Sequence, residues 1–107
     1  NKMKQLSADD LENLIQDKNV KLLDVREKHE FASGHIEGAL LVPSTNFWDN
    51  FNPLKIKKTD KIALYCQGGG RSSFVAEKLE AAGYSNIYNL EMGFSDWLAG
   101  KKKIVKE

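Results

Sequence analysis

The sequence contains a single cysteine, and this scarcity excludes two common kinds of structural site. One thiol cannot build an internal disulfide framework. Together with two histidines, it also cannot complete a standard structural zinc site unless carboxylates supply ligands. We therefore invoke no metal and expect no cofactor.

Long apolar runs and an excess of one charge are also missing. No hydrophobic stretch approaches the roughly 18 residues that suggest a membrane span. Lys and Arg number 16 against 15 Asp and Glu, which gives a formal net charge of +1 and argues against broad neutralisation of nucleic-acid phosphates. We expect neither a membrane nor a nucleic-acid partner, and any anion site must be local.

The chain is short enough to limit its organisation. Its 107 residues suffice for one hydrophobic core, so residues 1–107 are predicted to form a single domain. The first residue is Asn1 rather than Met, which is compatible with a processed or trimmed chain. The compartment is left open: the lack of disulfides favours a reducing cytoplasm, and a processed product would be compatible with the periplasm.

Short apolar runs alternate with helical patterns along the chain. Strands are predicted over residues 20–25, 38–42, 61–66 and 86–90, and helical segments over residues 7–15, 27–33, 72–82 and 94–99. This alternation predicts an α/β fold with a parallel central sheet and helices on both faces, in which ligands bind beyond the carboxyl ends of the strands. The least regular stretch, residues 46–60, is expected to loop over the surface.

The cysteine lies at the end of one of these predicted strands. Cys66 closes the apolar run 61–66 and opens the turn Gln67-Gly68-Gly69-Gly70-Arg71-Ser72. Consecutive glycines let backbone N–H groups point inward, which forms a concavity that favours anions and lowers the pKa of an enclosed thiol. The helix expected from Ser72 directs its positive end at the same turn, and Arg71 adds a fixed charge. Cys66 is therefore predicted to be a nucleophile.

Competing interpretations of the glycines depend on spacing. A phosphate-binding P-loop requires a Gly-Lys pair that is absent, and a dinucleotide fingerprint requires glycine where Ser73 stands. An isolated cysteine is more often a small buried hydrophobe, and glycine clusters are commonly just turns. Here the cysteine, glycines, arginine and helix start share one strand-to-helix turn, and this combination favours a reactive thiol over a structural one.

These motifs resemble those of a single-domain rhodanese, a sulfurtransferase family whose active loop is Cys, four residues, Arg and then Ser. In this chain that loop is Cys66 to Ser72. The resemblance covers nearly the whole chain, through residues 23–27, residues 30–39, Pro43, the pair Gly93-Phe94 and Trp97. It implies a rhodanese-like α/β fold.

The resemblance also implies a chemistry. Cys66 would take the outer sulfur of a small anionic donor such as thiosulfate, release sulfite, and pass the sulfur from its persulfide to cyanide, a small thiol or a protein thiol. The backbone N–H groups from Gln67 to Ser72 would hold that sulfur, and Arg71 would orient the donor. The expected substrate-binding residues are Gln67, Gly68, Gly69, Gly70, Arg71 and Ser72.

Two alternatives to this enzyme remain. Related phosphatases and arsenate reductases place five residues between Cys and Arg, so the four-residue spacing here favours sulfur over phosphate or arsenate chemistry. Some rhodanese-like domains act as sulfur carriers or interaction modules with little turnover of free thiosulfate, usually where the cysteine is lost. Cys66 is present in this chain.

Other residues are assigned supporting roles. Asp24 and Arg26 are expected to pair at a strand end and support the loop, in agreement with the resemblance. Phe47, Trp48 and Phe51 recur at helical spacing, which is most often typical of core residues. If they line the mouth of the loop instead, they would select the donor.

Overall fold

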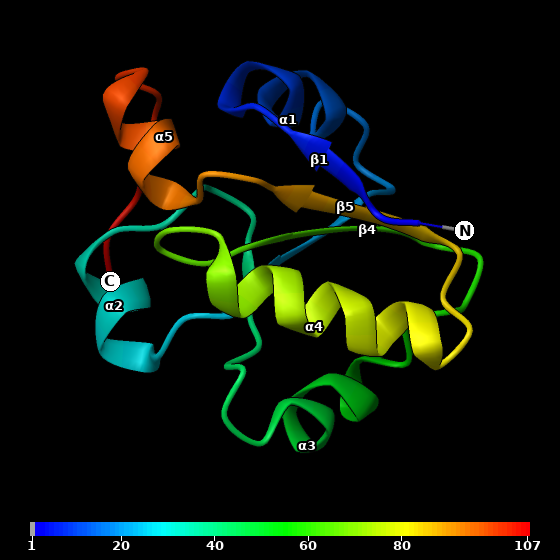
Figure 1. Cartoon of the computed structure of the whole chain (residues 1–107). Coiled ribbons are helices and arrows are strands. Elements are labelled where there is room, and N and C mark those ends of the chain that lie inside the picture. Colours follow the sequence, from blue (N-terminus) through cyan, green and yellow to red (C-terminus); the bar gives the residue numbers. More distant parts are fainter. Residues whose placement is uncertain (1) are drawn as a thin grey trace.

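A parallel sheet of five strands forms the centre of the structure, which is a computed structural model that describes residues 2–107 (Figure 1). The strands follow the order β1-β5-β4-β2-β3, and every neighbouring pair is parallel. Their bounds are Lys4–Leu6 for β1, Lys21–Asp24 for β2, Leu40–Leu41 for β3, Lys61–Tyr65 for β4 and Asn86–Leu90 for β5. All carboxyl ends therefore meet at one edge, with β4 in the middle.

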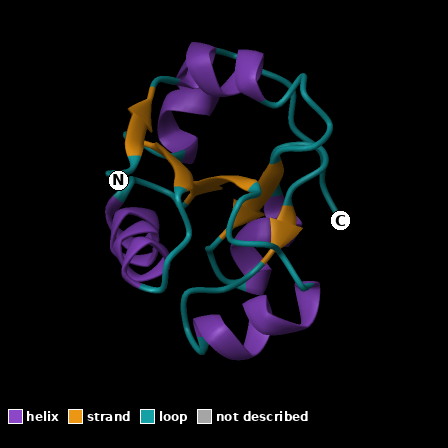
Figure 2. Cartoon of the chain, turned by 90° about the vertical axis from the view of Figure 1, so that its right-hand side faces the viewer, coloured by secondary structure: helices purple, strands orange, loops and turns teal. Residues whose placement is uncertain are grey.

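Helices cover both faces of this sheet, which confirms the fold class predicted from the sequence (Figures 1 and 2). The α-helices are α1 (Ala8–Leu14), α2 (Lys28–Ser33), α3 (Phe47–Phe51), α4 (Gly70–Ala81) and α5 (Phe94–Ala99), and a 3₁₀ helix, η1, spans Asn52–Leu54. Among the described residues, no helix is long and apolar enough to cross a membrane.

Alternation along the strands divides the core into two apolar clusters, because successive side chains point to opposite faces. On β4, Ile62 and Leu64 pack with residues of α3 and α4. Ala63 and Tyr65 pack with residues of α1 and α5 on the opposite face. Pairing with β2 on one side and β5 on the other sets the register of β4, and with it the position of the residue that follows the strand.

Residues 46–60 were expected to form a surface loop, and that prediction is wrong. The segment contains α3 and η1, because Phe47 and Phe51 stand four residues apart and are both buried in the cluster beside α4. The strand β1 was not predicted at all. It has only three residues and lies at the sheet edge, where backbone pairing with β5 rather than a hydrophobic pattern defines it.

Helix α4 begins two residues earlier than the sequence pattern predicts. Gly69 occupies the N-cap position with a φ of 100°, and its carbonyl accepts the N–H of Ser73 at 3.0 Å. The turn between β4 and α4 is therefore very short. Its tightness brings the first turn of the helix directly over the end of the strand.

Candidate active site

The sulfur of Cys66 lies at the floor of the turn between β4 and α4. The side chain is nearly inaccessible, with 1% of the residue exposed. The N–H of Gly69 points at Sγ from 3.1 Å, and the hydroxyl of Ser72 lies 3.5 Å away. Hydrogen-bond donors from both sides of the turn therefore converge on the one thiol of the chain.

These donors determine the acidity of the thiol. Burial by itself raises the pKa of Cys66, but hydrogen bonds from the Ser72 hydroxyl and from the N–H groups of Ser72, Gly69 and Gly68 outweigh it and lower the pKa below the ordinary value. The N-terminus of α4 reinforces the effect with its positive dipole end. The Ser72 hydroxyl has one proton, and its oxygen also lies 3.2 Å from the carbonyl oxygen of Gly69. A Cys66 thiolate therefore competes with that carbonyl for the hydroxyl proton.

The loop is held by the turn that follows β5. A β-carbon on Gly69 would lie 1.9 Å from the carbonyl oxygen of Glu91, and one on Gly93 would lie 2.4 Å from the carbonyl oxygen of Gln67. A β-carbon at Gly68 or Gly70, in contrast, would meet nothing within 4 Å. Only the middle glycine of the three is therefore demanded by backbone conformation and packing.

Residues at the start of α5 donate hydrogen bonds to carbonyl groups of the same loop. The N–H of Phe94 donates to the carbonyl of Cys66 at 2.8 Å, and the N–H and hydroxyl of Ser95 both donate to the carbonyl of Gln67, at 3.1 and 3.0 Å. Ser95 was not among the predicted site residues. The nearest sequence signal is the pair Gly93-Phe94, which belongs to the motifs of the rhodanese resemblance.

Asp24 and Arg26 pair as predicted and connect to the loop. The guanidinium of Arg26 donates to both carboxylate oxygens of Asp24, with the shortest distance 2.7 Å, and both side chains are buried. It also donates to Oε1 of Gln67 at 3.2 Å and to the carbonyl of Gly34 at 2.7 Å, while lying 4.4 Å from the ring centre of Phe94. The side chain of Gln67 is thereby fastened to the buried pair.

Arg71 does not extend freely from the loop. Its two terminal nitrogens donate to the two carboxylate oxygens of Glu30, on α2, at 2.8 and 3.0 Å. The hydrogen bond from Arg71 outweighs burial, and with help from the N–H of Glu27 it lowers the pKa of Glu30 to about 2. Sequence reasoning missed Glu30, although it stands first in the matched segment 30–39.

Among the aromatic residues Phe47, Trp48 and Phe51, the two phenylalanines lie in the core and Trp48 is partly buried against it. Phe47 and Phe51 are fully buried, and Trp48 packs against them with ring centres 5.2 and 5.7 Å away. The ring of Phe51 also lies edge-on to Tyr84, which follows the C-terminal end of α4. The loop is at the other end of that helix, so Phe51 belongs to the core rather than to the mouth of the site.

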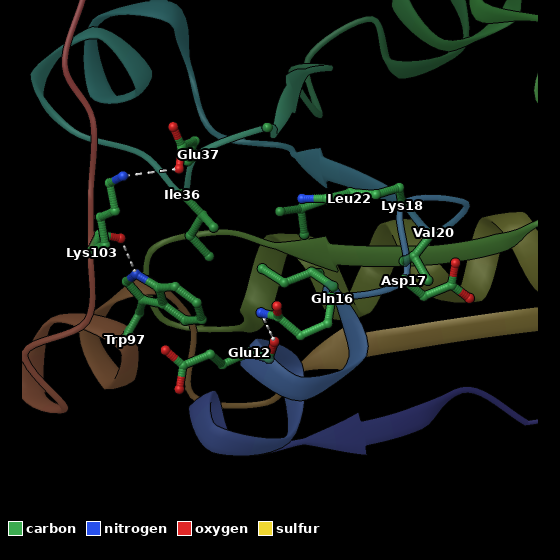
Figure 3. Close-up of a pocket in the computed structure, with 12 residues that line it drawn as sticks. Glu12, Gln16, Asp17, Lys18, Val20, Leu22, Ile36, Glu37, Trp97 and Lys103 are labelled. Carbon is green, nitrogen blue, oxygen red and sulfur yellow. Dashed lines mark hydrogen bonds and ion pairs between the residues drawn. The ribbon is translucent and has the colours of Figure 1, made fainter.

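A cavity of about 350 Å³ lies elsewhere, between α1, the start of β2 and α5 (Figure 3). Val20, Leu22, Ile36 and Trp97 contribute its apolar lining. Lys103 lies at its rim and pairs with Glu37. No residue of the loop from Cys66 to Ser72 lines this cavity. Within residues 2–107, moreover, no three His, Cys, Asp or Glu side chains gather as a metal site.

Comparison with known proteins gives consistent matches across most of the chain. A family model described as the rhodanese-like domain matches residues 7–100. The uncharacterized protein YqhL of Bacillus subtilis is 41% identical over 90 residues, which cover 83% of this chain and 68% of that protein. The crystal structure of a rhodanese-like domain protein from Staphylococcus aureus superposes with a TM-score of 0.83 at 36% identity, covering 98% of this chain and 99% of that one.

A longer relative contains a similar segment. The tRNA uridine(34) hydroxylase of Hamiltonella defensa is 31% identical over 102 residues, which cover 92% of this chain. The match spans only 29% of the hydroxylase. The similar segment is thus a minor part of that protein.

Proposed function

The chain belongs to the rhodanese-like domain family, and from this membership we propose that it is a sulfurtransferase whose Cys66 carries the transferred sulfur as a persulfide. One observation carries the proposal: the N–H of Gly69 and the hydroxyl of Ser72 converge on Sγ of Cys66. Such donors stabilise negative charge on sulfur, which a nucleophile and a persulfide both need. A cysteine that merely fills the core gains nothing from them.

The first step loads the cysteine. The Cys66 thiolate attacks the outer sulfur of a donor such as thiosulfate, a new sulfur–sulfur bond forms, and the bond to the sulfonyl sulfur breaks with its electron pair leaving on sulfite. The product is a Cys66 persulfide anion. The N–H groups of Gly68, Gly69 and Ser72, which act on the sulfur of Cys66, would also stabilise the charge that moves onto its outer sulfur.

The second step unloads it. A nucleophile such as cyanide, a small thiolate or a protein thiolate attacks the outer sulfur, and the Cys66 thiolate leaves as the sulfur–sulfur bond breaks. The features that lower the pKa of Cys66 make it a good leaving group in this step. No metal, cofactor, nucleic acid or membrane takes part in the proposed cycle.

The open surroundings of the loop support a thiol or protein-thiol acceptor. Gly68 and Gly70 present no side chain, and nothing lies within 4 Å of the positions their β-carbons would take. A bulky acceptor could approach over this surface. Arg26, which is paired with the buried Asp24, donates a hydrogen bond to Oε1 of Gln67 and so fixes that side chain.

A second function is favoured by one specific observation. The matching segment of the Hamiltonella hydroxylase makes up 29% of a longer protein, so a domain of this kind also serves inside larger chains. The corresponding proposal for this chain is a sulfur carrier or interaction module that is loaded by a partner and turns over free thiosulfate poorly.

Mass spectrometry of the intact chain tests the proposed function. After incubation with thiosulfate or with a thiol persulfide, the wild-type chain should gain one sulfur, and cyanide or a reduced thiol should remove it with a stoichiometric yield of product. Cys66→Ser should gain no sulfur while keeping its unfolding transition. Multiple turnover with thiosulfate favours the enzyme, and loading only from a persulfide with slow discharge favours the carrier.

Two results would overturn the proposal. One is turnover retained by Cys66→Ser. The other is an aryl phosphatase or arsenate reductase activity of the wild-type chain that requires Cys66 and is not accompanied by sulfur loading.

A further inference from the structure

Arg71, the arginine of the loop, is already paired with a carboxylate of the same chain. Both terminal nitrogens of Arg71 are engaged by the two carboxylate oxygens of Glu30, at 2.8 and 3.0 Å. Parallel N–H···O bonds of this kind are the strongest arrangement available to an arginine and a carboxylate. A second anion that approaches Arg71 must compete with Glu30 or bind beside it.

Glu30 is held in place from its own helix as well. Its Oε1 accepts the N–H of Glu27 at 2.9 Å, and the side chain of Glu27 accepts the backbone N–H of Glu30, so the two form a reciprocal cap at the start of α2. The hydroxyl of Thr45 donates to Glu27 at 3.0 Å. The carboxylate facing Arg71 is therefore part of a fixed structure rather than a mobile surface side chain.

The charged groups around the loop disfavour the binding of a dianion. Arg71 faces Glu30 in direct contact, with Glu27 and the Cys66 sulfur also contributing negative charge to its surroundings. A second cation, Arg26, is paired with the buried Asp24. Once Cys66 is a thiolate, four of these named groups are negative and two are positive.

From these contacts we infer that Glu30 is a specificity residue for the sulfur donor, disfavouring dianionic donors such as thiosulfate relative to donors of lower negative charge such as thiol persulfides. This inference rests on the proposed sulfurtransferase function. Its physical basis is that repulsion by a fixed carboxylate grows in proportion to the charge of the approaching donor. A dianion therefore loses twice as much interaction free energy as a monoanion at the same place.

Two sulfur donors that react through the same type of bond but differ in net charge separate the effect of donor charge from that of the reaction itself. Thiosulfate carries two negative charges and releases sulfite, whereas methanethiosulfonate carries one and releases methanesulfinate. In both cases the Cys66 thiolate attacks the outer sulfur and the same type of sulfur–sulfur bond breaks. Any change in their relative use reports on the charge at the entrance.

The variant Glu30→Gln removes that charge while preserving the cap, because glutamine can also accept the N–H of Glu27. We expect kcat/KM to rise by about tenfold for thiosulfate and about threefold for methanethiosulfonate, a factor of about three for each unit of donor charge. The matched control is Glu12→Gln. Glu12 also forms an ion pair, 2.7 Å from Lys102, but belongs to α1, which packs on the face of the sheet opposite α4. Both donors should therefore be unaffected by this substitution.

The outcomes distinguish the inference from the proposed function. A fall in thiosulfate use, or an equal change for both donors, would overturn the inference and show that Glu30 positions Arg71 for donor binding or acts on Cys66 itself. Sulfur loading of Cys66, followed by mass spectrometry in the same samples, would still establish the persulfide in that case. If neither these donors nor a thiol persulfide loads either protein, the proposed function and the inference both fall.

Discussion

The carbonyl oxygen of Glu91 occupies the space that a β-carbon on Gly69 would need, at a separation of only 1.9 Å. Gly69 also has a φ of 100°, which side chains rarely adopt. Gly69→Ala should therefore lower the free energy of unfolding by about 2 kcal/mol or more, from strain and overpacking together. Urea unfolding of the purified variant measures this loss.

The neighbouring glycines provide matched controls for that substitution. Gly68 and Gly70 have neither a left-handed φ nor a close neighbour at the β-carbon position. Gly70→Ala should be neutral or stabilising by up to about 1 kcal/mol, because alanine restricts the unfolded chain. Equal destabilisation at all three positions would contradict the special role of Gly69.

The hydrogen bond from Ser72 to Cys66 predicts a dependence on pH. Because donors to the sulfur lower the pKa of Cys66, the thiolate persists below the pH at which an ordinary thiol protonates. In Ser72→Ala the pKa should rise, so a smaller fraction should be thiolate at neutral pH. Ultraviolet absorbance of the thiolate during a pH titration reports on this group alone among thiols, since the chain has one cysteine.

Ser73→Ala is the control for this titration. Ser73 is the next residue on α4, and it contacts the loop through its backbone N–H, which alanine retains. Its titration curve should match that of the wild-type chain. If Ser72→Ala also left the midpoint unchanged, the hydroxyl would have no part in stabilising the thiolate.

Sequence reasoning recovered the parts of the site that are local in the chain. The apolar run before Cys66, the glycines and the helical pattern from Ser72 lie within about twenty residues, so their spacing predicts a strand, a tight turn and a helix. The pair Asp24 and Arg26 is equally local. These elements were predicted because each one depends mainly on its own residues.

What sequence reasoning missed depends on contacts between distant residues. Glu30 lies 41 positions before Arg71, and nothing in the composition of either segment indicates that the two side chains meet. The contact of Gly69 with Glu91 likewise joins two separate turns. The short strand β1 exists only because β5 pairs with it. Such features follow from the assembled sheet rather than from any local pattern.

Removing one member of the buried pair Asp24 and Arg26 should be costly. In Arg26→Met the carboxylate of Asp24 loses the guanidinium that donates to both its oxygens, and an uncompensated buried charge costs about 3–5 kcal/mol. Adding Asp24→Asn to that variant should recover part of the loss, because the stranded charge is gone. Urea unfolding of the two single variants and the double variant gives the coupling energy. Strictly additive losses would mean that the two side chains do not stabilise each other.

Trp48 provides the remaining prediction, which separates a core role from a role at the mouth of the loop. The Trp48 ring packs on Phe47 and Phe51. Phe51 in turn contacts Tyr84, which follows the C-terminal end of α4. Cys66 lies at the other end of this helix, which has 12 residues and is about 18 Å long. Trp48→Ala should therefore lower the free energy of unfolding by about 2 kcal/mol, less than for a fully buried ring, and leave the KM for the sulfur donor unchanged. Calorimetry and initial rates on the same preparation measure both quantities.

Phe74→Ala is the comparison, because Phe74 is 60% exposed on α4 and its loss should leave stability intact. A raised KM in Trp48→Ala with an unchanged unfolding temperature would place Trp48 at the mouth, because only contact with the donor would then explain the effect.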